Sequence, residues 1–306
     1  MLGFVSDKLD RRMTDRDEQS LRFFFHRPDA RIILFNNCDP VFSLSGQSPT
    51  CLFPVSVLKK FPALSTEIKS QIFIGFYAGE PVFALNISPS LSLSFMDNPD
   101  IETVHLRKAT VNALAPPEEL TLLGYAHSLI RWHEQTRFCS TCGSALHSVR
   151  GGIRQDCPNC TAQFFPRIDP VVIMLVYREG QCLLGSNRNF EAGRYSCLAG
   201  FLECGETIEA AVRREVWEEA GVNVKQVFYH SNQPWPLPNQ LMIGCFAEAE
   251  DTNILLQDEE LAAARWFSRE EAGQLLKGEL EGLSGPPEIA IAWHLIHAFV
   301  NGEGKE

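Results

Sequence analysis

The sequence from Gly200 to Val222 reads GFLECGETIEAAVRREVWEEAGV, and it decides how the chain around it folds. Its apolar side chains recur at every fourth position, which is the spacing of one ridge of an α-helix. That ridge consists of Ile208, Val212, Val216 and Ala220. The spacing therefore predicts a helix whose apolar ridge faces a hydrophobic core.

Acidic side chains gather on a neighbouring face of this predicted helix. Glu215, Glu218 and Glu219 stand at positions i, i+3 and i+4, where like charges destabilise a helix. A bound cation would remove this cost, and Mg²⁺ and Mn²⁺ prefer carboxylate oxygens as ligands. We therefore expect a divalent metal site here. An acidic surface helix after a glycine turn is the alternative, and for any one of these glutamates alone it is the better interpretation.

The same stretch resembles the Nudix box, G-x5-E-x7-R-E-U-x-E-E-x-G-U, in which U is an aliphatic residue. Every position matches, and Val216 and Val222 occupy the aliphatic ones. The fixed residues are Gly200, Glu206, Arg214, Glu215, Glu218, Glu219 and Gly221. Nudix proteins cleave a nucleoside diphosphate linked to another group, so the resemblance implies a hydrolase. It also implies an α+β fold in which a mixed sheet lies in an α/β/α sandwich.

The resemblance further implies a role for each polar residue of the box. Glu215 and Glu219 are expected to bind Mg²⁺ or Mn²⁺ directly, and Glu218 to be a further ligand or the general base. Arg214 is expected to orient the carboxylates and Glu206 to support the loop. The expected ligands of the catalytic metals, including a backbone carbonyl, are Ala199, Glu215, Glu218 and Glu219. A narrower resemblance, carried by residues 231–240, implies Glu260 as a further ligand.

Length and composition limit the class of protein. With 306 residues, 45% of them hydrophobic, the chain can bury a sizeable core and form two domains with a small insert. The net charge of −11 argues against general nucleic-acid affinity, but it allows a small anionic substrate that binds through metal. No apolar run approaches the roughly 20 residues that span a bilayer, and the N-terminal stretch lacks an apolar signal region. We therefore expect a cytoplasmic protein without a membrane segment.

Two C-x-x-C pairs, Cys139 with Cys142 and Cys157 with Cys160, are separated by fourteen residues. Four thiolates at this spacing suit a closed tetrahedral Zn²⁺ site, which has no open position for catalysis. We predict one structural zinc ion in a zinc ribbon; a redox pair or four reduced core thiols are the alternatives. Zinc ribbons also bind nucleic acids, which leaves a nucleic-acid-binding module as a further interpretation. Among the other cysteines, we expect buried thiols at Cys182, Cys197, Cys204 and Cys245.

The segments on either side of the ribbon read as strands and helices. Before it, strands are predicted at 31–35, 71–77 and 81–87, with a hairpin turn at 78–80 and a helix that begins at Pro116-Pro117-Glu118-Glu119. After it, strands are predicted at 171–177, 181–185, 225–230, 241–247 and 264–267. A capping box at 268–271 begins another helix, and a final helix is expected over about 287–300.

Residues 231–240, SNQPWPLPNQ, hold three prolines around Trp235, which excludes a helix or a central strand. We predict a stiff loop that either packs Trp235 into a core or forms a wall for a nucleoside. The loop resembles S-Q-P-W-P-F-P-x-S, which follows the Nudix box in the NADH pyrophosphatase subfamily. That subfamily also has an N-terminal domain and a four-cysteine ribbon in the same order. Three positions depart from the pattern, namely Asn232, Leu237 and Gln240.

This narrower resemblance implies a homodimer that hydrolyses NADH or NAD⁺ to AMP and nicotinamide mononucleotide. It implies that aromatic side chains stack on a base, in part across the dimer. The residues expected to contact substrate are Phe165, Phe201, Gln233, Pro234, Trp235, Pro236, Leu237, Pro238, Asn239, Gln240 and Ala292. A diphosphatase for ADP-ribose or a related nucleotide, or for NAD caps on RNA 5′ ends, is the alternative. The expected parts are a β-rich N-terminal domain at 1–134, the ribbon at 135–166 and the Nudix domain at 167–306.

Overall fold

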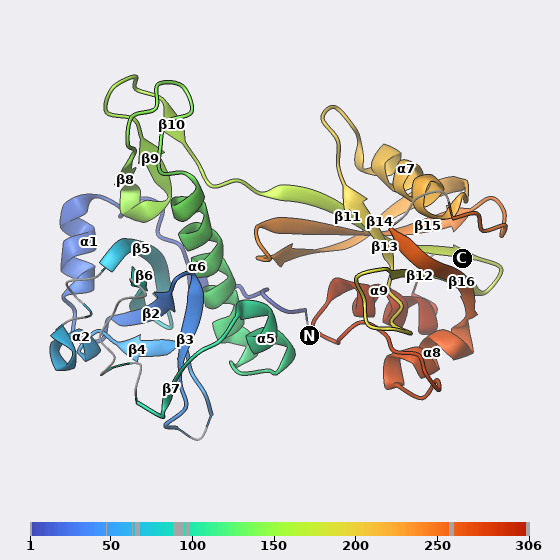
Figure 1. Cartoon of the computed structure of the whole chain (residues 1–306), viewed down its shortest axis with the longest axis horizontal. Coiled ribbons are helices and arrows are strands. Elements are labelled where there is room, and N and C mark those ends of the chain that lie inside the picture. Colours follow the sequence, from blue (N-terminus) through green and yellow to red (C-terminus); the bar gives the residue numbers. More distant parts are fainter. Residues whose placement is uncertain are drawn as a thin grey trace. The chain divides into compact units, whose positions relative to one another are not determined.

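The computed structural model describes residues 2–46, 48–62, 64, 68–87, 95, 98–256 and 260–303 (Figure 1). The chain forms two compact units. The N-terminal unit comprises Phe4–Arg167 together with Trp235–Asn239. The C-terminal unit comprises Met1–Gly3, Ile168–Pro234 and Gln240–Glu306.

A mixed sheet forms the centre of the N-terminal unit. Within the described residues it has seven strands in the order β1-β5-β6-β2-β3-β7, with β4 paired to β2. β2 and β6 run parallel, and the predicted hairpin between β5 and β6 is confirmed. The strands are β1 (Leu9–Asp10), β2 (Arg31–Asn36), β3 (Asp39–Ser43), β4 (Leu52–Pro54), β5 (Ile68–Tyr77), β6 (Glu80–Ile87) and β7 (Ile101–Thr103).

Helices pack around this sheet. The predicted helix after the double proline is α6, with proline in its first turn followed by Glu118 and Glu119, a favourable start because acids there complement the helix dipole. Its buried face includes Leu122, Leu123 and Ile130. The helices with described bounds are α1 (Glu18–Phe25), α2 (Val57–Lys60), α5 (Leu106–Val111) and α6 (Pro117–Gln135).

The cysteine-bearing segment folds as a small antiparallel sheet. Its strands are β8 (His147–Val149), β9 (Arg154–Asp156) and β10 (Gln163–Phe164), in the order β10-β9-β8. A 3₁₀ turn, η1 (Arg150–Gly152), joins β8 to β9. This ribbon belongs to the N-terminal unit.

The C-terminal unit is a sandwich of helices around a mixed sheet, as predicted. The order of the described strands is β14-β15-β11-β12-β16, with β13 paired to β11. β11 and β15 run parallel, and β12 and β13 run antiparallel to β11. The strands are β11 (Asp169–Arg178), β12 (Gln181–Asn187), β13 (Leu198–Phe201), β14 (Val224–Trp235), β15 (Gln240–Ala249) and β16 (Leu261–Ser268).

Each face of this sheet has its own hydrophobic core. Helix α7 (Ile208–Ala220) buries the predicted ridge residues Val212, Val216 and Ala220 against one face. Helices α8 (Arg269–Lys277) and α9 (Ile291–Val300) cover the other face. The capping box is confirmed, because the Ser268 and Glu271 side chains each accept a hydrogen bond from the other residue's backbone N–H. The predicted α+β class and the α/β/α sandwich are therefore confirmed.

Three sequence predictions are wrong in detail. The predicted loop 231–240 is strand until Trp235, because β14 is an edge strand and tolerates Pro234 there. Helix α9 begins at Ile291 rather than near residue 287, and it buries Ile291, Leu295 and Phe299. Cys204 is exposed, since it lies in the turn between β13 and α7 rather than on a strand.

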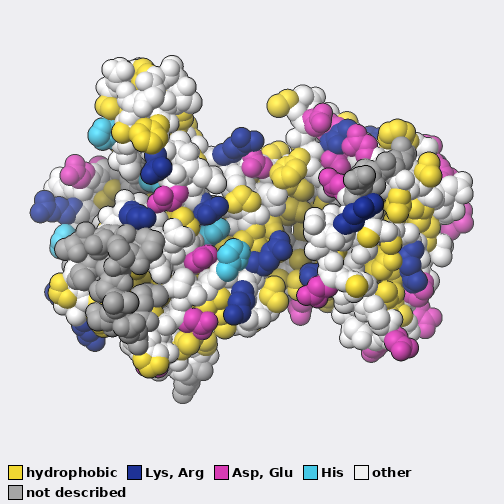
Figure 2. Space-filling view, viewed as in Figure 1, with side chains coloured by type: hydrophobic (Ala, Val, Ile, Leu, Met, Phe, Trp, Pro, Cys, Tyr) yellow, Lys and Arg dark blue, Asp and Glu magenta, His cyan; other side chains and the backbone are white. Residues whose placement is uncertain are grey.

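Charge is divided unevenly between the two units. The N-terminal unit carries 17 Lys and Arg against 16 Asp and Glu, a net charge of +1. The C-terminal unit carries 10 against 22, a net charge of −12, and the two values add to the −11 of the whole chain. On the face drawn in Figure 2, acids lie among basic side chains over the N-terminal unit. Among the described residues, no helix is long and apolar enough to cross a membrane.

Candidate active site and zinc centre

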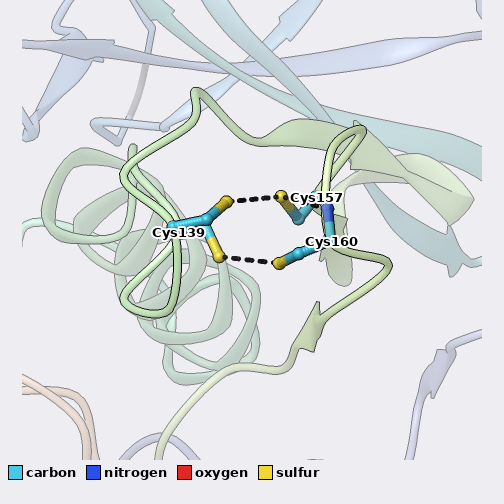
Figure 3. Close-up of side chains that lie close together, drawn as sticks. Cys139, Cys157 and Cys160 are labelled. Atoms are coloured by element: carbon cyan, nitrogen blue, oxygen red, sulfur yellow. Dashed lines mark hydrogen bonds between the residues drawn. The ribbon is translucent and has the colours of Figure 1, made fainter.

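The four cysteines of the ribbon come together, as their spacing predicts (Figure 3). Their sulfur atoms all lie within 4.8 Å of one another. The Sγ atoms of Cys139 and Cys160 are 3.5 Å apart, and so are those of Cys142 and Cys157. Zn–S bonds of about 2.3 Å in a tetrahedron place sulfurs about 3.8 Å apart, so the arrangement fits zinc with little movement. Hydrogen bonds from Ser144 lower the pKa of the Cys142 thiol, which favours the thiolate that a metal requires.

The start and the end of α7 explain why the acidic helix forms where it does. Thr207 is the N-cap, and its side chain accepts a hydrogen bond from the N–H of Ala210 at 3.2 Å. Gly221 ends the helix in the left-handed conformation, with φ of 68°, which glycine adopts without strain. The loop before α7 is tied by Glu206, whose Oε2 accepts from the N–H of Glu203 at 3.0 Å.

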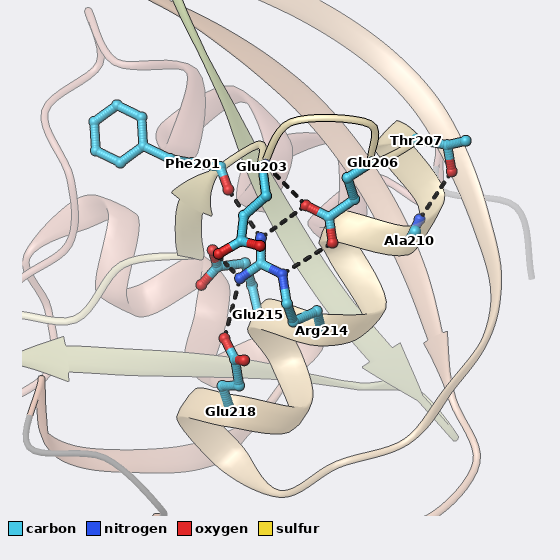
Figure 4. A network of polar contacts seen from close by, with 8 residues as sticks. All are labelled: Phe201, Glu203, Glu206, Thr207, Ala210, Arg214, Glu215 and Glu218. Carbon is cyan, nitrogen blue, oxygen red and sulfur yellow. Dashed lines mark hydrogen bonds and ion pairs between the residues drawn. The ribbon is translucent and has the colours of Figure 1, made fainter.

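Arg214 binds the acidic residues into one network (Figure 4). Its Nε and Nη2 donate to the two carboxylate oxygens of Glu206, each at 2.9 Å. Nη1 donates to Glu215 at 2.8 Å and to Glu218 at 3.0 Å. Nη2 also donates to the carbonyl of Phe201 at 2.9 Å. This bidentate fork fixes the loop and the helix acids relative to one another, which is the geometry expected for an orienting residue.

The electrostatics of the site reflect this crowding of carboxylates. Hydrogen bonding to Arg214 lowers the pKa of Glu206, and Glu206 in turn raises the pKa of Arg214 most strongly. Burial raises the pKa of Glu215, while the Arg214 guanidinium opposes that shift. Charges on Glu218 and Glu260 raise the pKa of Glu215 further, so the structure brings Glu260 close enough to interact with the helix acids. A cation among these groups would relieve their repulsion.

Backbone and side chain meet closely beside this cluster. A Cβ atom placed on Gly200 would lie 1.8 Å from Cδ of Glu215, so the missing side chain leaves the space that the carboxylate fills. Ala199, the neighbour of Gly200 on β13, pairs with Ile173 of β11. Glu219 is only 4% exposed, and burial of a carboxylate beside other acids is a setting that favours a nearby cation. Carboxylate donors gathered in this way fit a hard divalent cation, and a ligand role for the Ala199 carbonyl stays a prediction.

Gln233 lies at the end of β14 and is fully buried. Its Nε2 donates to the carbonyl of Gly3 at 2.9 Å and to the carbonyl of Ile289 at 2.8 Å. Its Oε1 accepts from the N–H of Ile291 at 2.8 Å, and α9 has no side-chain cap of its own from Ala290. The amide therefore caps α9 from another element, and its part in substrate binding stays a prediction.

We call residues 231–240 the Pro–Trp segment. Residues 235–239 of this segment belong to the N-terminal unit. The Trp235 ring packs edge-on against Phe4, with 5.8 Å between the centroids. Ser128 of α6 donates to the carbonyl of Pro238 at 3.3 Å, and Asn239 donates to the carbonyl of Arg167 at 2.8 Å. Trp235 therefore packs within the N-terminal unit, and substrate contact by residues 231–240 stays a prediction.

The predicted aromatic contacts lie in different units. Phe165, 62% exposed, belongs to the N-terminal unit, and Phe201, 54% exposed, belongs to the C-terminal unit. Gln240 begins β15, and Ala292 is buried in the first turn of α9. Two exposed phenylalanine rings are available for stacking, whereas Ala292 could contribute only through its backbone.

Family models match almost the whole chain from residue 29 to residue 284. The model for the NUDIX domain matches residues 167–284. A "NADH pyrophosphatase-like rudimentary NUDIX domain" matches residues 29–132, and a "NADH pyrophosphatase zinc ribbon domain" matches residues 134–165. A human protein named NAD-capped RNA hydrolase NUDT12 is 36% identical over 339 residues, covering 97% of this chain and 73% of that protein. The chain belongs to the Nudix hydrolase family.

Further relatives agree with the NADH pyrophosphatase type of Nudix hydrolase. NAD-capped RNA hydrolase NudC of Stutzerimonas stutzeri is 38% identical over 216 residues, or 71% of this chain and 75% of that protein. The mitochondrial NAD(P)H pyrophosphatase NUDT13 of mouse is 34% identical over 296 residues, or 87% of this chain and 83% of that protein. The predicted subfamily and its zinc ribbon are therefore confirmed.

Sequence reasoning assigned no function to Gly3 and His127, which contact residues of the segment 231–240 within their own units. Gly3 accepts the Gln233 amide, and a Cβ there would lie 2.2 Å from Cγ1 of Ile289. His127 of α6 shares a hydrogen bond with the backbone of Pro236. Neither residue stands in a motif or a periodic pattern, so the sequence offered no signal for either.

Proposed function

We propose that this Nudix hydrolase cleaves the diphosphate of NADH and NAD⁺ to AMP and the nicotinamide mononucleotide. The complete box, folded into one network around Arg214, carries this proposal. The Pro–Trp segment and the names of the relatives support the dinucleotide as substrate. The proposed cofactors are one structural Zn²⁺ on the four cysteines and catalytic Mg²⁺ or Mn²⁺.

The proposed metal ligands are the carbonyl of Ala199 and the carboxylates of Glu215, Glu218, Glu219 and Glu260. Bound metal would screen the diphosphate oxygens and lower the pKa of a water molecule. Arg214 keeps Glu215 and Glu218 in place, so little reorganisation is needed when substrate binds. The Glu218 side chain is 45% exposed, so water reaches its carboxylate, which could accept a proton as the general base.

Substrate binding is proposed to use the exposed ring of Phe201 beside the acidic cluster. The backbone carbonyl of Phe201 accepts a hydrogen bond from Arg214, which restrains the backbone that carries the ring. Phe165 and the Gln233–Gln240 segment are proposed as further contacts. The homodimer, the division at residues 134 and 166, and the cytoplasmic compartment belong to the same proposal. Static light scattering of the purified protein tests the dimer.

Removal of an NAD cap from RNA 5′ ends is a second candidate, favoured by the names of two relatives. Such a cap contains the same diphosphate, so the chemistry at the acidic cluster would be unchanged. The two candidate substrates differ only in the RNA that is attached to the dinucleotide. A comparison of kcat/KM for free NAD⁺ and for NAD-capped RNA distinguishes the two functions.

A substrate panel tests the proposal. NADH, NAD⁺, ADP-ribose and a short NAD-capped RNA are each incubated with the protein and Mg²⁺ or Mn²⁺, and the products are separated by chromatography. We expect the highest kcat/KM for NADH among the free nucleotides. Faster cleavage of ADP-ribose would instead support a diphosphatase of different specificity.

Glu219→Gln provides the catalytic control for this panel. Because it removes the charge of a buried proposed ligand, turnover should fall by about a hundredfold or more on every substrate, with the fold retained. Glu209→Gln, an exposed acid in the first turn of the same helix, should leave turnover unchanged. Near wild-type turnover of Glu219→Gln at saturating metal would overturn the assignment of the site.

A further inference from the structure

A groove of about 320 Å³ lies within the N-terminal unit, between α6, the η1 and β9 part of the zinc ribbon and the residues that follow β10. We call it the ribbon groove. Its walls include the apolar side chains of Met13 and Leu129 and the rings of Tyr125 and Phe165. Ligand sites in proteins range from about 300 to 1,000 Å³, so this volume fits one nucleotide rather than a whole dinucleotide.

Fixed cations border this apolar and aromatic surface. Arg150 and Arg154 both line the groove. Arg150 donates to a backbone carbonyl at 2.8 Å, and Arg154 pairs with Asp156 at 2.7 Å, so neither guanidinium group is loosely placed. A third guanidinium, from Arg11, lies 5.0 Å from the centre of the Tyr125 ring. Aromatic rings combined with arginine are the surface that binds the bases and phosphates of a single strand.

Another pocket, of about 470 Å³ in the C-terminal unit, is a weaker candidate for an anionic chain. Arg178 and Lys225 line it, but each lies near an acid that also lines the pocket, at 3.3 Å and 3.8 Å respectively. Asp156, the partner of Arg154, does not line the ribbon groove. The C-terminal unit also carries a net charge of −12, against +1 for the N-terminal unit. Long-range repulsion therefore disfavours a polyanion at that pocket and favours the ribbon groove.

We propose that the ribbon groove binds one nucleotide of a single-stranded RNA that carries an NAD cap at its 5′ end. The base lies against the aromatic wall formed by Tyr125, and the adjoining phosphates meet Arg150 and Arg154. The inference rests on the proposed function, because it names the surface that would hold the RNA body while the diphosphate is cleaved elsewhere. It also gives the zinc ribbon a task beyond its own stability, since β9 and η1 supply both arginines.

The test compares free NAD⁺ with a short, unstructured NAD-capped RNA on the full-length, zinc-loaded protein. The variants are Arg150→Gln and Tyr125→Leu, and Arg107→Gln on α5 removes the same charge outside the groove. For Tyr125→Leu we expect kcat/KM to fall by about tenfold on capped RNA, with NAD⁺ cleavage unchanged. For Arg150→Gln, the slope of log kcat/KM against log salt should become shallower by about 0.7 on capped RNA alone.

The outcomes separate this inference from the proposed function. An equal loss on both substrates would mean that the variants damage the enzyme as a whole, and no loss on either would mean that RNA does not enter the groove; both results overturn the inference. An equal effect of Arg107→Gln would show unspecific charge attraction and overturn it too.

Cleavage of NAD⁺ without any cleavage of capped RNA by the wild type would leave the proposed function intact and would show that RNA does not use the groove. If neither were cleaved, fluorescence anisotropy with an uncapped RNA of the same sequence would decide on the groove alone: loss of binding in both groove variants supports it, and equal binding overturns it.

Discussion

Arg214 distributes its donors over Glu206, Glu215, Glu218 and the carbonyl of Phe201, so one side chain connects the loop, the helix and β13. The connection explains how three acids can stand at i, i+3 and i+4 on α7 without breaking it. Charged hydrogen bonds from Arg214 restrain Glu215 and Glu218, and Glu219 is buried. We therefore expect metal binding to depend on the positions of these carboxylates as well as on their negative charge.

Gly200→Ala should therefore reduce activity without unfolding the protein. The new Cβ would meet the Glu215 carboxylate at 1.8–2.2 Å, and the flexible end of a glutamate can swing away while the backbone stays. We expect kcat to fall by about a hundredfold, because Glu215 leaves the position that Arg214 gives it. Turnover and the midpoint of thermal unfolding would be measured on the same preparation.

Gly273→Ala on α8 is the matched control. Its Cβ would make an ordinary contact of 3.5 Å with Val300, and alanine stabilises a helix relative to glycine. That variant should be as active as the wild type and slightly more stable. A fully active Gly200→Ala enzyme would show that Glu215 does not need its observed position.

The residues of the box were predictable because their chemistry follows a fixed spacing along one helix and its preceding turn. Gln233 illustrates what spacing cannot provide. It was expected to face a substrate, yet its amide contacts Gly3 and Ile291, which are distant in sequence. A buried amide is identified only by its partners, and partners become visible only in the folded chain.

At the scale of elements, α9 depends on β14 for its start. The first N–H groups of a helix have no partner inside it, and Ala290 cannot cap them with a side chain. Gln233 supplies the acceptor from the end of the neighbouring strand. This arrangement also ties the first residues of the chain to the helix, because the N–H of Gly3 donates to the carbonyl of Ile289 at 3.0 Å.

Gln233→Met should destabilise the C-terminal unit by at least about 2 kcal/mol. Methionine fills similar space but leaves one buried N–H and two carbonyls with fewer partners, at about 1–3 kcal/mol for each unsatisfied group. Unfolding in urea gives the free energy of unfolding. Gln226→Met, at an exposed position of the same strand, should change it little. Equal stability of both variants would show that Gln233 does not cap α9.

The ribbon should depend on zinc for stability, because its three strands are only two or three residues long. Cys157→Ser should lower the stability of the N-terminal unit before it affects chemistry, since Cys157 is a buried member of the proposed zinc set. Zinc content by mass spectrometry and unfolding by near-ultraviolet circular dichroism check this expectation. Cys204→Ser, at an exposed thiol, should retain zinc and stability. An inactive but fully stable Cys157→Ser protein would reverse the proposed order.

Most elements were predictable from apolar runs and turn residues, and the errors have physical causes. Proline excludes a central strand but not the edge strand β14, and sequence alone does not say which strand is at an edge. The start of α9 was misplaced because its cap comes from Gln233 rather than from a local Ser, Thr, Asn or Asp.

At the scale of the whole molecule, neither unit is one continuous stretch of sequence. The motifs alone predict one continuous domain after another. Residues 235–239 leave the sheet of the C-terminal unit and pack in the N-terminal unit before β15 begins. The order of ribbon and box was predictable because each carries its own motif, whereas the N-terminal domain was expected from predicted strands and from the subfamily resemblance. The crossing of residues 235–239 was not predictable, because it depends on contacts of Trp235 and Pro238 with residues far away in sequence.

Mild acid should weaken the N-terminal unit through His127. Burial lowers the pKa of this imidazole to about 4, with smaller contributions from the charges of Arg131 and His105. The unfolded chain, with a pKa near about 6.5, then binds more protons than the folded chain, so stability falls as the pH drops from about 6.5 towards 4. Urea unfolding across this range measures the slope.

His127→Asn should flatten that slope, whereas His147→Asn, at an exposed position on β8, should not. Burial also lowers the pKa of His133 on α6, so part of the slope should remain in the variant. An unchanged slope in His127→Asn would show that the imidazole is not shielded from solvent.

The identity of the products from NADH tests the central claim most directly. The protein is incubated with NADH and Mg²⁺ or Mn²⁺, and the products are identified by chromatography and mass spectrometry, with Glu219→Gln treated in parallel. We predict equal amounts of AMP and reduced nicotinamide mononucleotide, formed only with divalent metal and almost absent in the variant. Intact NADH after prolonged incubation, or equal cleavage by Glu219→Gln, would contradict the account.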